Sequence, residues 1–136
     1  MIGKDLLPQT GFNQFVGFRL IEWDVDYACI SLELEAQHMN GLNIAHGGVL
    51  LSALDFACGM SGSYQPPPME RRYCVTVSLS THFINPLRDG HLRATAHRIG
   101  GGKSIFFAES EIFDASNTRI ATASGAFRLL PNKPLT

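Results

Sequence analysis

The apolar segment at residues 49–60 constrains the fold of this chain more than any other feature, because it contains an acidic residue, Asp55. If the segment is helical, apolar side chains occur on almost every side of the helix, and such a helix is typically buried. An ionised carboxylate that is removed from water destabilises a fold by several kcal/mol unless it is paired or has a function. Asp55 therefore requires either a structural partner, such as an arginine or a backbone donor, or a role in the chemistry of the protein.

The residues just before this helix supply complementary chemistry. The triplet His46-Gly47-Gly48 places backbone N–H groups at the helix start, where they have no partner within the helix. Such donors, with the positive end of the helix dipole, stabilise a developing negative charge, and a glycine lets a substrate carbonyl approach the main chain closely. Taken alone, the triplet is more typical of a simple turn, and His46 of a hydrogen-bonded structural histidine.

The spacing between the two groups predicts how they could act together. Asp55 follows Gly47 by eight residues, which is about 12 Å along a helix axis. A base or nucleophile must come within about 3 Å of the atom that it attacks or of the water that it activates. One copy of the helix cannot present both groups to the same carbonyl. If they collaborate, Asp55 comes from a second subunit, in a two-fold homodimer whose helices lie side by side.

Composition excludes several classes of function. The 136 residues fit a single domain over residues 1–136 that is long enough to bury a core. The net charge is −1 with 17% charged residues, and the scattered Lys and Arg leave no basic surface for nucleic acid. No apolar stretch of signal-peptide or membrane-spanning length follows the N-terminus. We therefore expect a soluble, cytoplasmic protein that binds neither nucleic acid nor membranes.

The cysteines and histidines do not predict a metal site. Cys29, Cys58 and Cys74 are an odd number without Cys-x-x-Cys spacing, and two of them lie in apolar runs, so we interpret them as small buried hydrophobic side chains. The five histidines show no spacing typical of metal ligands. We expect neither a bound metal nor a cofactor.

The remaining pattern predicts one helix and a sheet. A short N-terminal helical cap is expected at about residues 4–16, and β-strands at 18–26, 28–35, 73–84, 91–99, 104–114 and 119–130. In the second strand, Ile30, Leu32 and Leu34 alternate with more polar residues, which predicts one buried face. Links of hairpin-like length join the last four strands, so we expect them to form an antiparallel meander. The fold class is therefore α+β, with a sheet wrapped around a central helix.

Three motifs together resemble a known family. Asn40 lies six residues before His46-Gly47-Gly48, Asp55 lies nine residues after His46, and a later strand ends in Phe83-Ile84-Asn85-Pro86. Over roughly residues 12–130 the chain resembles the hotdog-fold acyl-CoA thioesterases of the PaaI type. The resemblance implies a hotdog fold, with a long central helix wrapped by a mostly antiparallel sheet of five to six strands. It also implies hydrolysis of acyl-CoA to a free acid and CoA.

The resemblance assigns roles to particular residues. Asp55 matches the acidic nucleophile or general base, and Gly47 matches the backbone donor that polarises the thioester carbonyl. Asn40 matches an amide that positions substrate or water, and Thr76 falls where relatives carry a hydroxyl that orients the water. The family's sites are shared between subunits, so we expect a homodimer that assembles further into a dimer of dimers.

Two positions depart from the family pattern. Asn43 stands where relatives usually have glycine, which is compatible because asparagine can adopt positive φ, but it leaves open which asparagine faces the site. Ser78 occupies a strand position where aspartate is frequent, which alters the pocket rather than the chemistry. We count both among the substrate-binding residues, together with His46 and Gly48.

The sequence is less informative about the substrate. The loop at residues 64–69, with a tyrosine, three prolines and a methionine, and the Phe-rich strands suggest an apolar pocket for an aryl or medium-chain acyl group. The basic residues that could meet the CoA phosphates, each of which is also compatible with an ordinary solvated charge, are Arg71, Arg72, Arg88, Lys103 and Arg128. We include Lys103 among the expected substrate contacts.

Other functions remain compatible with the same fold. A non-catalytic acyl-CoA-binding or regulatory domain would need the pocket but not a correctly placed carboxylate, so Asp55 weighs against it. A hydratase or dehydratase would need a histidine paired with the acid, and none follows Asp55 at that family's spacing.

Overall fold

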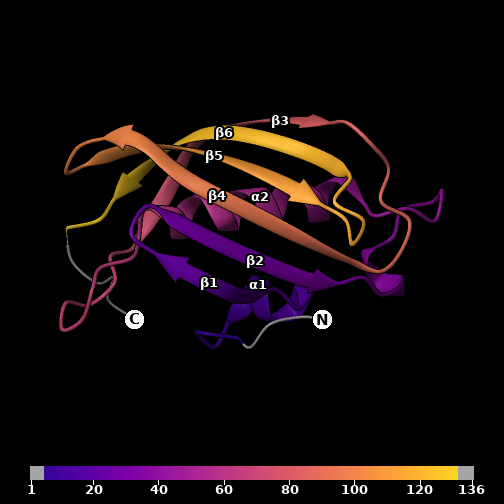
Figure 1. The fold of residues 1–136 in the computed structure, drawn as a ribbon, viewed down its shortest axis with the longest axis horizontal. Helices are drawn as coiled ribbons and strands as arrows, with labels where there is room; N and C mark the ends of the chain where they lie inside the picture. The colour runs from indigo at the N-terminus through magenta and orange to yellow at the C-terminus, as the bar shows by residue number, and fades with distance from the viewer. Residues whose placement is uncertain (1–4, 132–136) are drawn as a thin grey trace.

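The computed structural model describes residues 5–131, which form one long helix lying across the concave side of a curved six-stranded sheet (Figure 1). The elements are α1 (Gly11–Val16), β1 (Arg19–Asp24), β2 (Tyr27–Glu33), a 3₁₀ turn (Ala36–His38), α2 (Gly47–Ser61), β3 (Cys74–Phe83), β4 (His91–Gly101), β5 (Ile105–Phe113) and β6 (Arg119–Leu129). The α+β fold class is confirmed, and the expected hotdog arrangement of helix and antiparallel sheet is present. The predicted helix and all six predicted strands are found, with ends shifted by a few residues.

The order of the strands differs from the expected meander. It is β1-β2-β4-β5-β6-β3, so β3 pairs with β6 at the sheet edge and not with β4. The link after β3 is not a hairpin, because Asn85 is bound to β6 through its side-chain amide and the Arg119 carbonyl at 2.8 Å. The chain then crosses the end of the sheet, where Leu87 is buried and its carbonyl accepts from the Ala45 N–H at 2.7 Å. This crossing joins the β3 edge to the loop that leads into α2.

The expected one-sided burial of β2 is wrong. Cys29 and Ser31 on its outer side are 0% and 2% exposed, as buried as the inner Ile30. The side chains of Tyr27 and Glu22 cover this outer side. They are joined to each other, because the Tyr27 hydroxyl donates to the Glu22 carboxylate at 3.0 Å. The burial raises the pKa of the Cys29 thiol to about 12.

The N-terminal helix is shorter than predicted. It covers only Gly11–Val16, and the left-handed Gly17, with φ of 101°, ends it. The first residue of the expected cap, at about residue 4, lies outside the described residues. Two aromatic side chains of this helix, Phe12 and Phe15, are 60% and 82% exposed.

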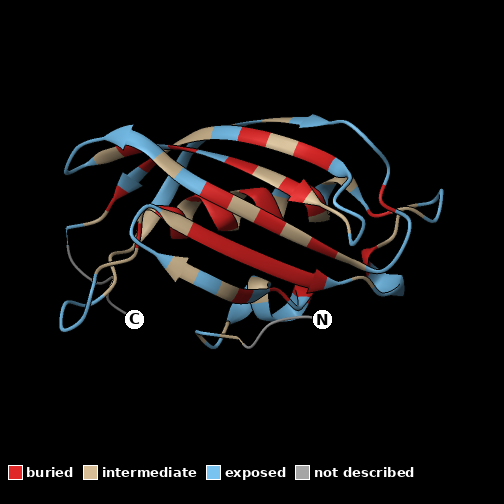
Figure 2. Cartoon of the chain, in the orientation of Figure 1, coloured by how far each residue is buried: buried red, intermediate tan, exposed pale blue. Residues whose placement is uncertain are grey.

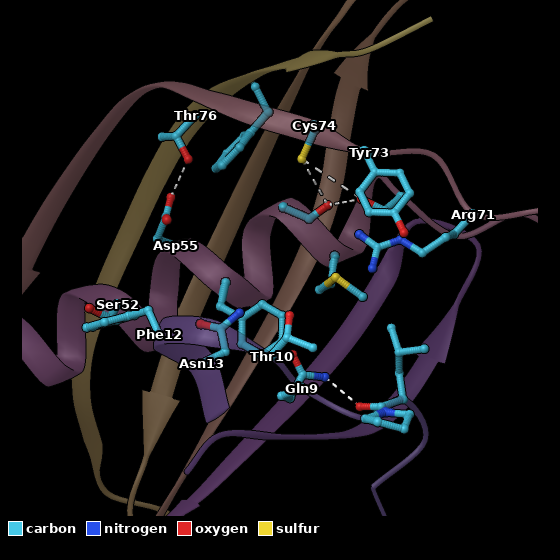
Figure 3. A pocket seen from close by; sticks show the side chains of 17 residues that line it. Gln9, Thr10, Phe12, Asn13, Ser52, Asp55, Arg71, Tyr73, Cys74 and Thr76 are labelled. Carbon is cyan, nitrogen blue, oxygen red and sulfur yellow. Dashed lines mark hydrogen bonds between the residues drawn. The ribbon is translucent and has the colours of Figure 1, made fainter. Parts of the chain in front are cut away.

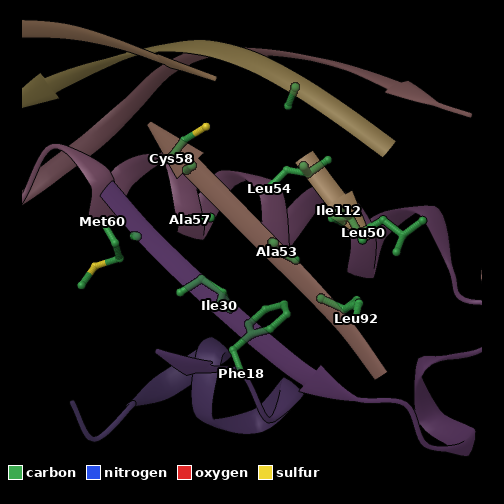
Figure 4. Close-up of a cluster of buried hydrophobic side chains, with 14 of the residues drawn as sticks. Phe18, Ile30, Leu50, Ala53, Leu54, Ala57, Cys58, Met60, Leu92 and Ile112 are labelled. Atoms are coloured by element: carbon green, nitrogen blue, oxygen red, sulfur yellow. The ribbon is translucent and has the colours of Figure 1, made fainter. Parts of the chain in front are cut away.

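Helix α2 is buried on one side only. Leu50, Leu54 and Ala57 face the sheet and are almost inaccessible to water (Figures 2 and 4), and each leucine contributes about 1.5–3 kcal/mol by leaving water. The C-terminal end of the helix is held by β1, because the Trp23 indole N–H donates to the Met60 carbonyl at 2.8 Å. On the opposite side Leu51 is 39% exposed. Within one chain, the expectation of a helix buried all round is therefore wrong.

The helix ends at a glycine that the core requires. A Cβ built at Gly62 would overlap the ring of Phe106, which is fully buried and stacks on Phe127 at 5.2 Å between ring centroids. We expect Gly62→Ala to lower the free energy of unfolding by about 1–3 kcal/mol, because the core must shift to admit the methyl group. Urea unfolding measures the change. Gly41→Ala is the matched control, since a Cβ there meets nothing within 4 Å, and an equal loss in both variants would contradict the overpacking argument.

Candidate active site

The start of α2 leaves one backbone donor free. His46 precedes the helix with φ of −63° and ψ of 135°, and its Nδ1 accepts from the Gly48 N–H at 2.8 Å. The His46 carbonyl accepts from the Val49 and Leu50 N–H groups at 2.9 and 3.2 Å. Among residues 5–131, the Gly47 N–H has no acceptor. The His46 side chain therefore caps the helix by accepting from the Gly48 N–H, and the Gly47 N–H is the donor that stays free.

The loop before the helix gives the two asparagines different roles. The Asn40 Oδ1 accepts from the Leu42 N–H at 2.9 Å and from the Ile44 N–H at 3.3 Å, which closes the loop. The Asn40 side-chain amide nitrogen has no acceptor in the described part of the chain. Asn43 has φ of 59°, the left-handed conformation that asparagine tolerates well. The geometry supports a backbone role for Asn43 and leaves the Asn40 amide available to a ligand.

Asn40 and Gly47 line the same cavity. It has a volume of about 310 Å³, and residues 83–87 at the end of β3 and in the link after it form its other wall. The Phe83 ring lies against Gly47, and a Cβ at position 47 would be 3.5 Å from it, an ordinary contact.

A hydrogen-bonded pair marks a second cavity. The Thr76 hydroxyl on β3 donates to the Asp55 Oδ1 on α2 at 2.7 Å. A register shift between Thr76 and Ser78 interrupts the pairing of β3 with β6 at this point, and such a bulge redirects side chains. Asp55 is only partly covered in one chain. Thr76 thus fixes one carboxylate oxygen and leaves the other available.

The second cavity has a volume of about 450 Å³ and a mixed lining (Figure 3). Its apolar walls include Phe56 and Met60. Polar side chains also line it: Gln9 and Asn13 come from the N-terminal segment, and Arg71 and Tyr73 come from the residues just before β3. The loop at residues 64–69, which we expected to line an apolar acyl pocket, does not line it.

The predicted catalytic residues fall into two groups within one chain. Asn40 and Gly47 line the smaller cavity, and Asp55 and Thr76 line the larger one, with no residue common to both linings. This separation agrees with the distance of about 12 Å expected from the helix rise. A single chain presents two half-sites.

None of the five predicted substrate-binding residues lines either cavity: His46, Gly48 and Asn43 lie beside Gly47 at the start of α2 or in the loop before it, and the other two lie elsewhere. Ser78 is exposed and pairs with Ala126 beyond the bulge of β3. Lys103 is exposed in the turn between β4 and β5, where its carbonyl accepts from the Arg72 guanidinium at 3.2 Å. Their roles stay predictions.

The sequence did not predict the cavity position of Arg71, which was named only as one of five basic residues that could meet the CoA phosphates, with Lys103 preferred. Of these, only Arg71 lines the Asp55 cavity. An arginine close to aromatic residues just before a strand is the signal that could have drawn attention to it.

The thiols near the helix do not compete with Asp55 as nucleophiles. The Cys58 thiol is buried beside the Ser110 hydroxyl at 3.2 Å, and burial raises its pKa to about 12. Burial also raises the pKa of Cys74, which lines the cavity. These thiols stay protonated near neutral pH, and Cys29 and Cys58 are buried as predicted.

Residues 5–131 contain neither a cluster of metal-binding side chains nor a membrane-spanning helix. No group of three or more His, Cys, Asp or Glu side chains among them could hold a metal ion. None of their helices is long and apolar enough to cross a membrane.

Comparison with known proteins identifies the family. The model of the thioesterase superfamily matches residues 42–121, which contain α2, Asp55 and Thr76. The chain therefore belongs to the thioesterase superfamily, and its class of reaction is thioester hydrolysis.

Relatives and solved structures agree with this family. The medium/long-chain acyl-CoA thioesterase YigI of Escherichia coli K12 is 21% identical over 140 residues, covering 93% of this chain and 90% of YigI. A protein of Saccharolobus solfataricus named as a candidate esterase is 25% identical over 125 residues, covering 91% of this chain and 81% of the relative. The structure of the E. coli PaaI protein from the phenylacetic acid degradation operon superposes with a TM-score of 0.78 at 24% identity, covering 89% of this chain and 85% of PaaI.

Thr76 is the simplest group of the site to test. Thr76→Val removes the hydroxyl that fixes the Asp55 carboxylate, and we expect kcat for thioester hydrolysis to fall by roughly ten- to a thousandfold, as for other positioning groups. Thr76→Ser keeps the hydroxyl and should retain most of the activity. Release of free thiol gives the rate. Equal rates in the two variants would show that the hydrogen bond is not needed.

The two asparagines are tested against each other. We expect Asn40→Ala to lower kcat by roughly ten- to a thousandfold and Asn43→Ala to be milder, because Asn43 serves the backbone. Asn40→Asp keeps the acceptor that closes the loop but removes the amide donor, so its kcat separates the two functions of that side chain. If Asn43→Ala proved the more damaging change, the assignment would have to be reversed.

Proposed function

We propose that the protein hydrolyses acyl-CoA thioesters at a site shared between two subunits. The observation that carries this proposal is the division of α2 into two half-sites, with the free Gly47 N–H in one cavity and the Asp55–Thr76 pair in the other. The relative YigI, named as a medium/long-chain acyl-CoA thioesterase, supports CoA thioesters as the substrate class.

Gly47 acts on the carbonyl of the thioester. Its N–H, at the positive end of the α2 dipole, donates to the carbonyl oxygen and stabilises the tetrahedral oxyanion. Loss of one such donor typically raises the barrier by about 3–4 kcal/mol. Asn40 lines the same cavity, and its side-chain amide positions the substrate or the water.

Asp55 of the other subunit supplies the base or the nucleophile. With Oδ1 held by Thr76, its second oxygen either takes a proton from water or attacks the acyl carbon directly. Direct attack releases the CoA thiolate and leaves a mixed anhydride of the acyl group with Asp55, which a water molecule then cleaves. In both routes the C–S bond breaks, one water is consumed, and the products are the free acid and the CoA thiol. In a single turnover in ¹⁸O-labelled water, label in the Asp55 carboxylate identifies direct attack, because water that Asp55 activates places its oxygen only in the released acid.

The uncovered side of the molecule supports the dimer. On the edge strand β3, Val75 and Val77 are 49% and 60% exposed, and Leu51 on the open side of α2 is 39% exposed. An edge strand with exposed apolar side chains favours pairing with another chain. A second copy placed there brings two α2 helices side by side. Assembly into a dimer of dimers, a single domain over residues 1–136 and a cytoplasmic location stay predictions.

Mixing two inactive variants tests the shared site. Asp55→Asn removes the base but keeps the shape, and Gly47→Pro removes the N–H donor. Proline suits this position because it is the first residue of α2, and the ψ of 135° at His46 is compatible with a following proline. In the heterodimer, one site receives both lesions and the other receives the native Gly47 and the native Asp55. We expect activity to reappear on subunit exchange and to approach about half of the parental value per heterodimer.

The controls separate catalysis from folding. Gly47→Ala keeps the N–H and adds a methyl group at ordinary contact distance from Phe83, so it should fold like the native protein, and a higher activity than that of Gly47→Pro would assign the difference to the N–H donor. Sedimentation must show that both inactive parents are folded oligomers. No recovered activity after confirmed exchange would contradict the shared site, and near-parental kcat in Asp55→Asn would show that this carboxylate is structural.

A further inference from the structure

Arg71 carries a positive charge in the Asp55 cavity and has no carboxylate partner among the residues that the structure describes. Its guanidinium carbon lies 4.2 Å from the centroid of the Tyr73 ring and 5.7 Å from that of Trp23. Within residues 5–131 its hydrogen bonding is limited to one long contact, from Nε to the Arg72 carbonyl at 3.5 Å. No carboxylate among these residues lies within 4.0 Å of it. Both terminal nitrogens of Arg71 are therefore free to donate to a ligand.

The surroundings of Arg71 make an anionic ligand favourable. Partial burial lowers the pKa of the guanidinium from its ordinary value, because the charged form loses hydration. The two aromatic rings compensate through cation–π contacts but accept no hydrogen bonds. A planar guanidinium with free donors matches a carboxylate in a bidentate pair better than any other common side chain does.

Arg71 and Asp55 lie at opposite ends of the cavity. Figure 3 shows the guanidinium beneath the Tyr73 ring with its nitrogens directed inward, and the Asp55–Thr76 pair on the far side. The wall contributed by α2 and the residues just after it runs from Ser52 to Ser63, and its part between Asp55 and Ser63 spans about 12 Å at the helical rise. An acyl group whose thioester carbon meets Asp55 can therefore place its other end at Arg71.

The side chains that line the cavity between Asp55 and Arg71 also favour an acyl group with a polar end. Gln9 and Asn13 from the N-terminal segment and Tyr73 beside Arg71 bring polar groups into the cavity. The Gln9 amide already donates to the Leu7 carbonyl at 2.6 Å, but a purely hydrocarbon chain would leave the Asn13 side chain and the arginine unpaired when water is displaced, which is unfavourable.

We propose that the Asp55 cavity selects acyl groups that carry a carboxylate at the end remote from the thioester, and that Arg71 binds this carboxylate. The inference rests on the proposed function, because it names the substrate class of the same site. Arg71 is here a specificity residue and takes no part in breaking the C–S bond.

Matched pairs of thioesters test the proposal. Each pair has the same chain length and differs only in a terminal carboxylate or methyl group: adipoyl-CoA with hexanoyl-CoA, and suberoyl-CoA with octanoyl-CoA. The measured quantity is the ratio of kcat/KM for the carboxylated over the methyl-terminated member. In Arg71→Met we expect this ratio to fall on the order of ten- to a hundredfold, the effect of a charge-assisted hydrogen-bonded pair.

Two variants control for charge and fold. Arg71→Lys keeps the charge without the planar fork and should restore part of the ratio. Arg19→Met removes an exposed arginine that does not line the cavity, and it should leave the ratio unchanged. If Arg71→Met lowers kcat/KM equally for both members of a pair, the arginine serves the shared CoA part or the fold, and the proposal is overturned.

Binding of methyl esters separates this inference from the proposed function. Titration calorimetry with monomethyl suberate and methyl octanoate, whose neutral ester stands in for the thioester end, should show that monomethyl suberate binds more tightly to the native protein and that Arg71→Met removes the difference. Arg71-dependent binding of monomethyl suberate without hydrolysis of any acyl-CoA would support the cavity assignment and contradict the proposed activity. Hydrolysis with equal use of both members of each pair, and no preference for monomethyl suberate, would overturn the inference while leaving the proposed function intact.

Discussion

Leu50, Leu54 and Ala57 of α2 pack against the curved sheet so closely that water hardly reaches them, and this contact determines what the rest of the helix can do. A sheet that curves around a helix from one side leaves the opposite side without a covering layer. In this chain Asp55 and Leu51 lie on that open side. The carboxylate thus avoids the full desolvation penalty in a single chain, and the exposed apolar residues beside it provide the surface that a second copy can bury. Function and association both depend on the one-sided packing of α2.

The two ends of α2 are fixed by different contacts, and these contacts keep the two half-sites at a constant distance from each other. At its start, His46 caps the helix through Gly48, and the Ala45 N–H binds the link after β3. At its end, Trp23 of β1 holds the Met60 carbonyl. Because the helix is rigid between these anchors, the separation of Gly47 and Asp55 is set by the helical rise alone. No side-chain rotation could bring them to one carbonyl within a chain.

Much of this arrangement was predictable because it depends on local pattern. The apolar run at residues 49–60 indicated the central helix, and the position of Asn43 in a loop indicated a left-handed residue, which the φ of 59° confirms. The pairing of β3 with β6 was missed, because strand order depends on contacts between distant residues such as Asn85 and Arg119. The burial of the outer face of β2, where Ser31 is 2% exposed, was missed for a similar reason, since it depends on side chains of the neighbouring strand. Motif spacing pointed to Asp55 and Thr76, and the structure adds the hydrogen bond that joins them.

The Asp55 cavity contains two groups of opposite charge, the Asp55 carboxylate and the Arg71 guanidinium, that do not form an ion pair with each other. An ion pair between Asp55 and Arg71 would fix the carboxylate and weaken it as a proton acceptor, because a nearby cation stabilises the ionised form. The protein instead gives Asp55 a neutral hydrogen-bond donor, Thr76, and gives Arg71 two aromatic neighbours. Each charged group is oriented without being paired. The Asp55 carboxylate keeps one oxygen free for water activation or direct attack, and the Arg71 guanidinium keeps its terminal donors free for an anionic ligand.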